Sequence, residues 1–339
     1  MPRKLATALA LAALLVMTAC GQAAETADTT ASDTPSDPAT PAPASGTVRL
    51  YSSVTQDTVD AVIAAYEAAH PDTTVELFRA PTGELSARIA AEQREGGVEA
   101  DVLWLTDPLS MQQYASEGML QTWTPDEVDA VPAEFAEDTF WGTRILNMII
   151  VHQADLEPAP ASWDDLAEGG HDQPVAIPDP GFAGSAFGAL AYFALNEEFG
   201  LDYYQALKDA GAVQVQAPGE VVTGVAEGRF AAGMTLDREA RDAVDDGSPI
   251  EVVYPESGAI AIYSPIAVVA GTSNAAAAES FANFTLTTEA QQAIAETGWQ
   301  PIRDDVEWDI GGDAVTPDWD AGFERQDELL EQYREIFGG

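Results

Sequence analysis

The chain has 339 residues, with 57 acidic and 14 basic side chains and a formal net charge of −43 at pH 7. This length allows one large or two medium domains with a substantial core. A field of this sign repels nucleic acid and anionic lipid headgroups, which excludes both as direct partners.

The first twenty residues predict a lipoprotein signal. Arg3 and Lys4 precede an apolar run over 5–16, which is shorter than the ~20 residues of a membrane-spanning helix. The run leads into Met17-Thr18-Ala19-Cys20. This order resembles the bacterial lipoprotein signal, which implies removal of residues 1–19 and a diacylglycerol on Cys20. The protein is therefore expected at the cell membrane, lipid-anchored and facing the extracytoplasmic side.

Cys20 is also the single cysteine of the chain. Once it carries a lipid, no thiol is left for a disulfide, a nucleophile or a cysteine-ligated metal. Residues 20–46 are rich in Ala, Thr, Ser, Pro and Asp and show no apolar periodicity, so they predict a disordered tether. Without residues 1–19 the chain has 12 basic against 57 acidic side chains, a net charge near −45. The lipid, and not a basic patch, must then hold it to the membrane.

From Val48 onward, apolar runs of strand length alternate with segments of helical periodicity. This alternation predicts a parallel, doubly wound sheet. The acidic stretch at 123–138 predicts a solvated surface, because its spacing matches no calcium-binding loop. The predicted strands are 48–51, 74–78 and 102–105, and the predicted helices are 59–66, 82–90 and a third that Gly118 ends.

A second unit of the same kind begins at residue 146. Ser162 precedes two aspartates and predicts a helix N-cap. The predicted strands are 146–151, 175–177, 213–215, 231–236 and 250–253, with two further apolar runs, 260–262 and 266–269, around Ser264-Pro265. The predicted helices are 186–195, 220–227, 238–244, 275–285, 289–296 and 323–337.

The segment 177–190 organises this second unit. A buried strand ends in Pro178 and Pro180, a loop with Gly181 and Gly184 follows, and a helix starts after Ser185. Such a helix start leaves free backbone N–H groups at the positive end of the helix dipole, which can hold a phosphate, sulfate or carboxylate. The simpler interpretation is that Ser185 is only an N-cap and the glycines form only a turn.

The same logic applies to the other strand ends. Ligands of open α/β sheets lie beyond the carboxyl ends of the strands, so two such units facing each other would form a cleft. Its predicted lining is polar and lies at strand ends or helix starts: Ser52, Ser53, Thr82, Gly83, Thr106, Asp107, Gly184, Ser185, Thr235 and Asp237.

Motifs for catalysis and cofactor binding are missing from the sequence. Ser185 lacks the flanking glycines of a hydrolase elbow, and there is no phosphate loop and no H-E-x-x-H. His70, His152 and His171 lie far apart in the sequence. No catalytic residue, cofactor or metal is therefore predicted. A secreted lipoprotein hydrolase acting through Ser185 remains the alternative from another class.

Several sequence blocks occur in a fixed order between about Leu50 and Ile302, among them ADVLWLTDP, PASWDDLA, IPDPGFAGSAFGAL and ETGWQPIR. In this order they resemble the extracellular solute-binding proteins of bacterial ABC importers, in the class of ferric-ion and 2-aminoethylphosphonate binders. The resemblance implies an α/β, two-lobed periplasmic-binding-protein-like fold. Each lobe would be a doubly wound sheet, and hinge strands near 147–151 and 259–263 would join them.

The resemblance also implies boundaries, contacts and partners. Lobe 1 would comprise 47–145 with about 262–302, lobe 2 would comprise 146–261, and 303–339 would form a C-terminal helical segment. The protein is expected to act as a monomer that hands a small-molecule solute to an ABC permease. The implied ligand contacts are Ser52, Ser53, Thr82, Gly83, Asp107, Arg144, Gly184, Ser185 and Ala186.

The positions at which this chain differs from the family pattern narrow the choice of ligand. Ferric binders of the class carry adjacent tyrosines after the strand that corresponds to 231–234, where this chain has Thr235-Leu236-Asp237-Arg238. Tyr203 and Tyr204 lie in a predicted helix and are expected to pack in the interior. The helix starts and Arg144 favour an anion, and Asp107 and Asp237 could receive an ammonium group. A phosphonate-like zwitterion is favoured, and iron(III) or an iron chelate is the alternative.

Overall fold

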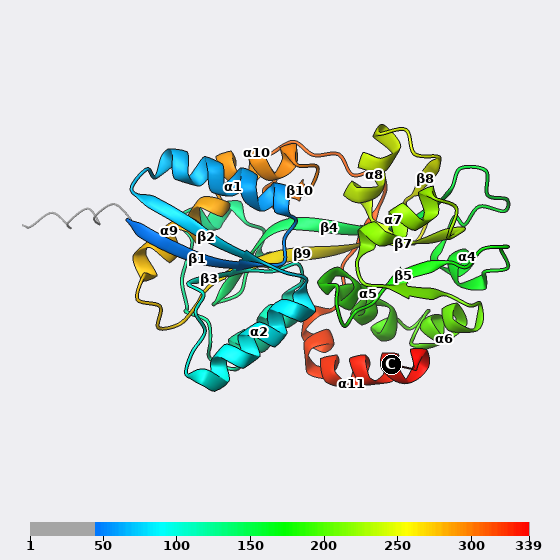
Figure 1. The fold of residues 1–339 in the computed structure, drawn as a ribbon, viewed down its shortest axis with the longest axis horizontal. Helices are drawn as coiled ribbons and strands as arrows, with labels where there is room; N and C mark the ends of the chain where they lie inside the picture. Colours follow the sequence, from blue (N-terminus) through cyan, green and yellow to red (C-terminus); the bar gives the residue numbers. More distant parts are fainter. Residues whose placement is uncertain (1–44, 339) are drawn as a thin grey trace, which may run out of the picture. The chain divides into compact units, whose positions relative to one another are not determined.

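The computed structural model describes residues 45–338, which belong to one compact unit. The predicted signal, Cys20 and the tether up to residue 44 lie outside the described residues. None of the helices between residues 45 and 338 combines the length and the apolar character that crossing a bilayer requires. Within this part the chain forms an α/β structure of two lobes joined by two long strands (Figure 1).

Lobe 1 is built on three parallel strands, with β1 in the middle between β2 and β3. Each strand leads into a helix, so α1, α2 and α3 begin at the carboxyl ends of β1, β2 and β3. In Figure 1, α1 and α10 lie above this sheet and α2 lies below it. The elements are β1 (Gly46–Ser52), α1 (Gln56–Ala69), β2 (Thr73–Arg79), α2 (Thr82–Glu95), β3 (Val102–Trp104), α3 (Pro108–Ser116), α9 (Ala275–Thr285) and α10 (Thr288–Glu296).

Lobe 2 repeats this arrangement, with β5 paired in parallel to β6 and β7. Ser162 and Asp165 form a capping box at the start of α4, as the sequence predicts. The elements are α4 (Trp163–Glu168), β5 (Ala176–Pro178), α5 (Gly184–Leu195), α6 (Asp202–Asp209), β6 (Val213–Val215), α7 (Pro218–Ala226), β7 (Ala232–Leu236), α8 (Asp237–Asp245) and β8 (Ile250–Val253).

Two buried antiparallel strands, β4 (Phe140–Gln153) and β9 (Ala259–Val268), join the lobes. β9 pairs with β3 of lobe 1 and β4 pairs with β7 of lobe 2, both antiparallel. Within each lobe β1–β3 and β5–β7 pair in parallel, as the alternation predicts, and the hinge strands join them into one mixed sheet in the order β2-β1-β3-β9-β4-β7-β5-β6. The sheet is continuous through both lobes because β4 and β9 are largely apolar on both faces, so they can run through the interior of each lobe.

The two apolar runs around Ser264-Pro265 are a single strand, β9. A proline is tolerated there because the pairing of β4 with β9 shifts register between Gly142 and Arg144, and such a bulge is a place where a missing ladder N–H does no harm. Thr143, at the bulge, donates its hydroxyl to the Ser264 carbonyl oxygen over 2.7 Å. Arg144 therefore follows directly on a bulge in a hinge strand.

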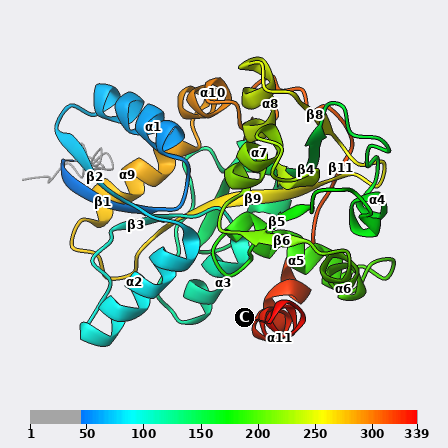
Figure 2. The same ribbon diagram turned by 45° about the vertical axis from the view of Figure 1, so that its right-hand side comes forward.

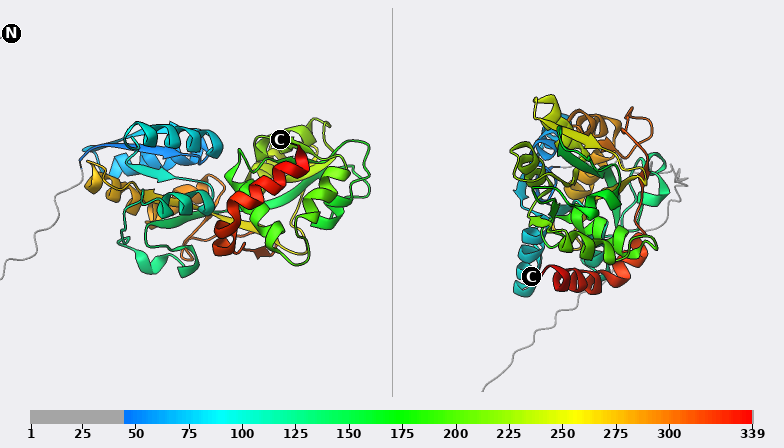
Figure 3. Two further views of the ribbon diagram at one scale, coloured as in Figure 1. Left: turned by 90° about the horizontal axis from the view of Figure 1, so that it is seen from below. Right: turned by 90° about the vertical axis from the view of Figure 1, so that its right-hand side faces the viewer.

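The C-terminal segment lies against both lobes. It contains β10 (Gln300–Pro301), β11 (Ala314–Val315) and α11 (Trp319–Phe337). α11 packs on α3 of lobe 1 and on α5 and α6 of lobe 2 (Figures 2 and 3). At Gly322 an added Cβ would lie 3.2 Å from Ala191 of α5 and 3.3 Å from Leu109 of α3. The acidic stretch at 123–138 carries two short 3-10 turns, η1 (Val128–Ala130) and η2 (Ala133–Phe135).

Candidate functional site

A cavity of about 110 Å³ lies where the two lobes and the hinge meet. Since one water molecule needs roughly 10–15 Å³ of such space, the cavity can hold a small organic molecule but not a large one. Lobe 1, the hinge strand β4 and lobe 2 all contribute to its wall. The lining includes Ser53, Thr55, Arg79, Pro81, Thr82 and Thr106 from lobe 1, Arg144 and Leu146 from β4, Ala183, Gly184, Ser185, Ala217, Leu236 and Glu239 from lobe 2, and Trp299 before β10.

Five of the eleven ligand-binding residues predicted from the sequence line this cavity: Ser53, Thr82, Arg144, Gly184 and Ser185. The other six lie in the same segments but behind the wall: Ser52, Gly83, Asp107, Ala186, Thr235 and Asp237. Two of these six are turned into the protein. The Ser52 hydroxyl donates to the Trp104 carbonyl oxygen at 2.8 Å, and the Thr235 hydroxyl donates to the Pro218 carbonyl oxygen at 2.9 Å.

Arg144 is the most unusual residue of the site. Its side chain has no solvent exposure, and all three guanidinium nitrogens lack a hydrogen-bond partner among the described residues. Its guanidinium carbon lies 4.4 Å from the ring centre of Trp299. Burial lowers the pKa of Arg144 to about 9, so the group remains charged at neutral pH. Because buried polar groups are almost always hydrogen-bonded, this cation is set up for an acceptor that enters the cavity.

Helix N-termini surround the same space. The N-cap residues of α1, α2, α5, α7 and α8 all line the cavity: Thr55, Pro81, Ala183, Ala217 and Leu236. None of these five side chains caps its own helix. By contrast, α3, α4, α10 and α11 are capped by the side chains of Asp107, Ser162, Thr287 and Asp318. Two of these helices already use a first-turn N–H: Gly83 of α2 donates to the Phe182 carbonyl oxygen, and Arg238 of α8 donates to the Asp237 carboxylate. The five helix starts still turn the positive end of the dipole towards the cavity, and the first-turn N–H groups of α5 have no side-chain acceptor.

Hydroxyl groups complete the lobe 1 wall. The Thr106 hydroxyl is hydrogen-bonded to Thr82 at 3.1 Å and to Ser53 at 3.3 Å. The lobes touch beside this group, because a Cβ added to Gly184 would lie 2.7 Å from the Thr106 hydroxyl and 2.2 Å from an Asp107 carboxylate oxygen. Only glycine allows α5 to approach lobe 1 this closely.

The two aspartates expected to receive an ammonium group are engaged elsewhere. Asp107 caps α3, accepting from the Ser110 backbone N–H at 2.8 Å and from the Ser110 hydroxyl at 3.1 Å. Asp237 accepts from the Arg238 backbone N–H at 2.7 Å and has longer contacts of 3.4 Å to Arg241 and Tyr254. Neither side chain lines the cavity.

Glu239 is the acidic residue that the sequence analysis missed. It lines the cavity, and its Oε2 atom is buried without a hydrogen-bond partner. Burial raises the pKa of Glu239 to about 7. Arg79 and Trp299 were also missed. Arg79 is the last residue of β2 and could have been found by the strand-end rule, whereas Glu239 lies inside the first turn of α8, and Trp299 precedes β10.

The adjacent tyrosines pack in the core, as expected. Tyr203 and Tyr204 are 4% and 3% exposed. Tyr203 stacks on Phe193 with ring centres 3.9 Å apart, and Tyr204 meets the same ring edge-on. Burial raises the pKa of both phenols well above its usual range. They are not available as phenolate ligands.

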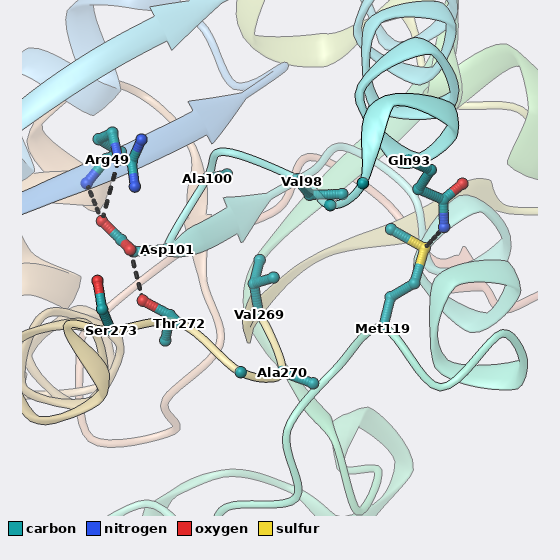
Figure 4. A pocket seen from close by; sticks show the side chains of 13 residues that line it. Arg49, Gln93, Val98, Ala100, Asp101, Met119, Val269, Ala270, Thr272 and Ser273 are labelled. Carbon is teal, nitrogen blue, oxygen red and sulfur yellow. Dashed lines mark hydrogen bonds and ion pairs between the residues drawn. The ribbon is translucent and has the colours of Figure 1, made fainter. Parts of the chain in front are cut away.

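A larger hollow of about 660 Å³ lies on lobe 1, away from the hinge, and Figure 4 shows its lining. Its buried carboxylate, Asp101, already accepts from the Arg49 backbone N–H at 2.8 Å and from the Thr272 hydroxyl at 2.5 Å. No lining residue has a buried side-chain nitrogen or oxygen without a partner in the described structure. No buried polar group in this hollow therefore needs a ligand to complete its hydrogen bonds.

Comparison with known proteins decides the family. Residues 48–300 match the family model described as bacterial extracellular solute-binding protein. The chain belongs to this family. Such proteins bind a small solute on the extracytoplasmic side and serve an ABC permease, and this is the function of the chain at the coarse level.

The relatives of this solute-binding protein agree with that assignment. It is 26% identical, over 69% of its own length and 71% of the relative's, to a Salmonella typhimurium protein named "Putative 2-aminoethylphosphonate-binding periplasmic protein". Among solved structures it resembles AfuA of Actinobacillus pleuropneumoniae, determined with fructose-6-phosphate bound, with a TM-score of 0.76 and 19% identity over 86% of this chain and 98% of that one. It also resembles iron-bound HitA of Pseudomonas aeruginosa, with a TM-score of 0.73 and 20% identity over 86% and 99% of the two chains. At these identities the structural likeness shows the two-lobed fold.

The cap at Asp107 gives a first prediction. Replacing Asp107 by Ala removes the side chain that satisfies the start of α3, which should lower the free energy of unfolding by about 1–2 kcal/mol. Asp107→Asn keeps a good N-cap and should change stability by less. Urea unfolding followed by circular dichroism measures both variants. Equal losses in the two variants would show that capping is not what Asp107 does.

The raised pKa of Glu239 gives a second prediction. Its carboxyl ionises near 4.5 when unfolded and near 7 when folded, so the folded state holds the proton longer and loses stability as pH rises between these values. Glu239→Gln cannot ionise. Relative to this variant, the ligand-free wild type should lose roughly 2–3 kcal/mol between about pH 5 and about pH 8. Thermal unfolding of both proteins across this range tests it, and a pH-independent difference would contradict it.

Proposed function

We propose that this solute-binding protein captures a small phosphonate- or phosphate-like anion between its lobes and delivers it to the permease without altering it. The protein would do this as a monomer, held to the membrane by the lipid on Cys20. The ligand contacts would be the five predicted residues that line the cavity, together with Arg79, Thr106 and Trp299. The two lobes that close on the ligand would be residues 47–145 with about 262–302, and residues 146–261.

The observation that carries the proposal is the buried, unpartnered guanidinium of Arg144 in a ring of helix N-termini. Arg79 adds a second cation to the wall. A phosphonate or phosphate presents several acceptor oxygens, which suits a guanidinium fork, backbone N–H groups and hydroxyls together. Lobe closure removes water from these contacts and strengthens them.

The relatives support the same ligand class by their names. One is named for 2-aminoethylphosphonate and another was solved with a sugar phosphate. The strongly negative net charge opposes anion entry, but screening over ~8 Å at physiological salt confines that repulsion to short range.

Iron(III) is the alternative ligand, since HitA was solved with iron bound. The cavity wall of this chain contains no tyrosine, histidine or cysteine and combines two arginines with one glutamate. Among residues 45–338 no group of three or more His, Cys, Asp or Glu could hold a metal ion. A wall of this charge disfavours a bare trivalent cation, although it could accept an anionic chelate.

Because no tyrosine lines the cavity, adding ferric citrate to the purified protein should give no visible charge-transfer band from a tyrosinate complex. Absorption spectra with and without ferric citrate make the measurement. A band in the visible range would restore iron(III) as the ligand. Calorimetry with ferric citrate then distinguishes binding of the intact chelate from binding of iron(III) by tyrosinate. Arg144 could support binding of the intact chelate without any tyrosine.

The hydrolase alternative depends on Ser185. Ser185 lines the cavity, but His70, His152 and His171 do not, so no imidazole is at hand to take its proton. The family match also names binding proteins and not enzymes. No observation on this chain favours hydrolysis.

Arg144 provides the test of the proposed function. Arg144→Met keeps the length and apolar stem of the side chain but removes its charge, so affinity for 2-aminoethylphosphonate should fall by more than about tenfold. Because the pKa of Arg144 is about 9, the wild-type affinity should also decline as pH rises through that value.

Isothermal titration calorimetry of the wild type, of Arg144→Met and of a control variant measures these affinities. The matched control is Arg229→Met, which removes an exposed arginine of lobe 2 paired with Glu227 and should leave binding unchanged. Equal affinity of Arg144→Met and wild type would reject the role of Arg144. If the wild type binds no phosphate, phosphonate or sugar phosphate, the proposed function itself fails.

A further inference from the structure

Glu239 is the one carboxylate among the residues that line the cavity, where it faces two arginines and several helix N-termini. An acidic group in such a place works against an anionic ligand, because it adds repulsion at short distance in a site sheltered from water. Its presence therefore needs a reason beyond anion binding.

Glu239 does not serve as the counter-ion of a neighbouring arginine. No ion pair within 4.0 Å joins it to any described residue, and its Oε2 atom has no hydrogen-bond partner. The nearby Arg238 pairs instead with Asp57 at 2.5 Å and with Asp242 at 2.8 Å. Arg79 donates to the Val54 carbonyl oxygen at 2.8 Å. Both Glu239 and Arg144 thus keep unused hydrogen-bonding capacity in the same cavity.

The two unsatisfied groups belong to different walls. Arg144 comes from the hinge strand β4 and lies on the Trp299 ring. The Glu239 carboxylate lies beside the first turn of α7, where a Cβ added to Gly219 would be 3.5 Å from its Oε2 atom. A ligand that satisfies both groups needs an acceptor for Arg144 and a donor for Glu239.

We infer that Glu239 binds the ammonium group of the ligand and makes the cavity selective for aminophosphonate-type zwitterions over anions without an amine. This inference rests on the proposed function, because it assumes that the anionic end is held at Arg144 and the helix N-termini. The charges then balance: two arginines and one glutamate meet a phosphonate and one ammonium. A ligand without the amine would bring its phosphonate near the carboxylate and would lack the charge-assisted hydrogen bond that offsets this repulsion.

The test uses 2-aminoethylphosphonate and ethylphosphonate, which differ only in the amine. By calorimetry at about pH 8, the wild type should bind the amine-bearing ligand at least about tenfold more tightly, as a charge-assisted hydrogen bond allows. Glu239→Gln should lose most of this preference by weakening 2-aminoethylphosphonate, while ethylphosphonate binds as well as before or better. Asp245→Asn, an exposed change on the same helix, should keep the wild-type preference.

The outcomes separate the two proposals. If the wild type binds both phosphonates equally, Glu239 does not read the amine, and the anion site at Arg144 stands. If Glu239→Gln gains affinity for both ligands alike, Glu239 acts as general repulsion and the inference is wrong. If neither phosphonate binds the wild type, the proposed function falls and this inference falls with it.

A second measurement needs no variant and remains available if Glu239→Gln does not fold. With its pKa near 7, Glu239 is mostly protonated at about pH 5.5, so the wild-type preference for the amine should shrink there. Because the ammonium group lowers the second pKa of its own phosphonate, each affinity is first corrected for the dianion fraction of that ligand, obtained by titrating the free ligand. The charged groups that act on Glu239 are Arg238, Arg144, Asp242 and Asp57. An unchanged ratio between the two pH values would overturn the inference.

Discussion

The structure depends on one costly feature, the complete burial of a guanidinium group that finds no hydrogen-bond acceptor among residues 45–338. A buried charge without a partner is strongly unfavourable, and proteins normally avoid it or pair it. Arg144 persists because it lies in a hinge strand held on both sides by pairing, with its plane on the Trp299 ring. A ligand that brings an acceptor would gain the hydrogen bonds that the Arg144 guanidinium does not make within the protein. In the function that we propose, binding and lobe closure would therefore be parts of one event.

The distribution of helix caps follows the same logic. Helices that start at the cavity lack side-chain caps, whereas four others use Asp107, Ser162, Thr287 or Asp318. In a capped helix the side chain of the N-cap residue accepts a hydrogen bond from a first-turn N–H group. In an uncapped helix that N–H group can donate to a ligand instead. The missing caps are not confined to the cavity, because α6 and α9 also lack a side-chain cap and their N-cap residues do not line it. Gly184 adds to this arrangement, because only a residue without Cβ lets α5 approach Asp107 and Thr106 of lobe 1.

Opposite charges at one site would explain how a protein of such negative net charge selects a small anion, as we propose. Arg144, Arg79 and the helix ends provide a local positive region that long-range repulsion does not cancel once salt screens it. In the site that we propose, Glu239 would divide that region into an anionic and a cationic subsite. Specificity would then come from the repulsion between the carboxylate and an anion without an amine, as much as from attraction to the right ligand.

The sequence by itself determined the alternation of strands and helices, the two α/β units and the polar strand ends, because these depend on local periodicity and turn chemistry. It also predicted that Tyr203 and Tyr204 pack inside, since they lie on a helix. Only the tertiary structure decided that one mixed sheet runs through both lobes, because pairing of β9 with β3 and of β4 with β7 joins residues far apart in the chain. Only the tertiary structure showed that Asp107 and Asp237 are engaged within the protein while Glu239 faces the cavity. A carboxylate's neighbours, and not its position in a pattern, decide whether it caps a helix or meets a ligand.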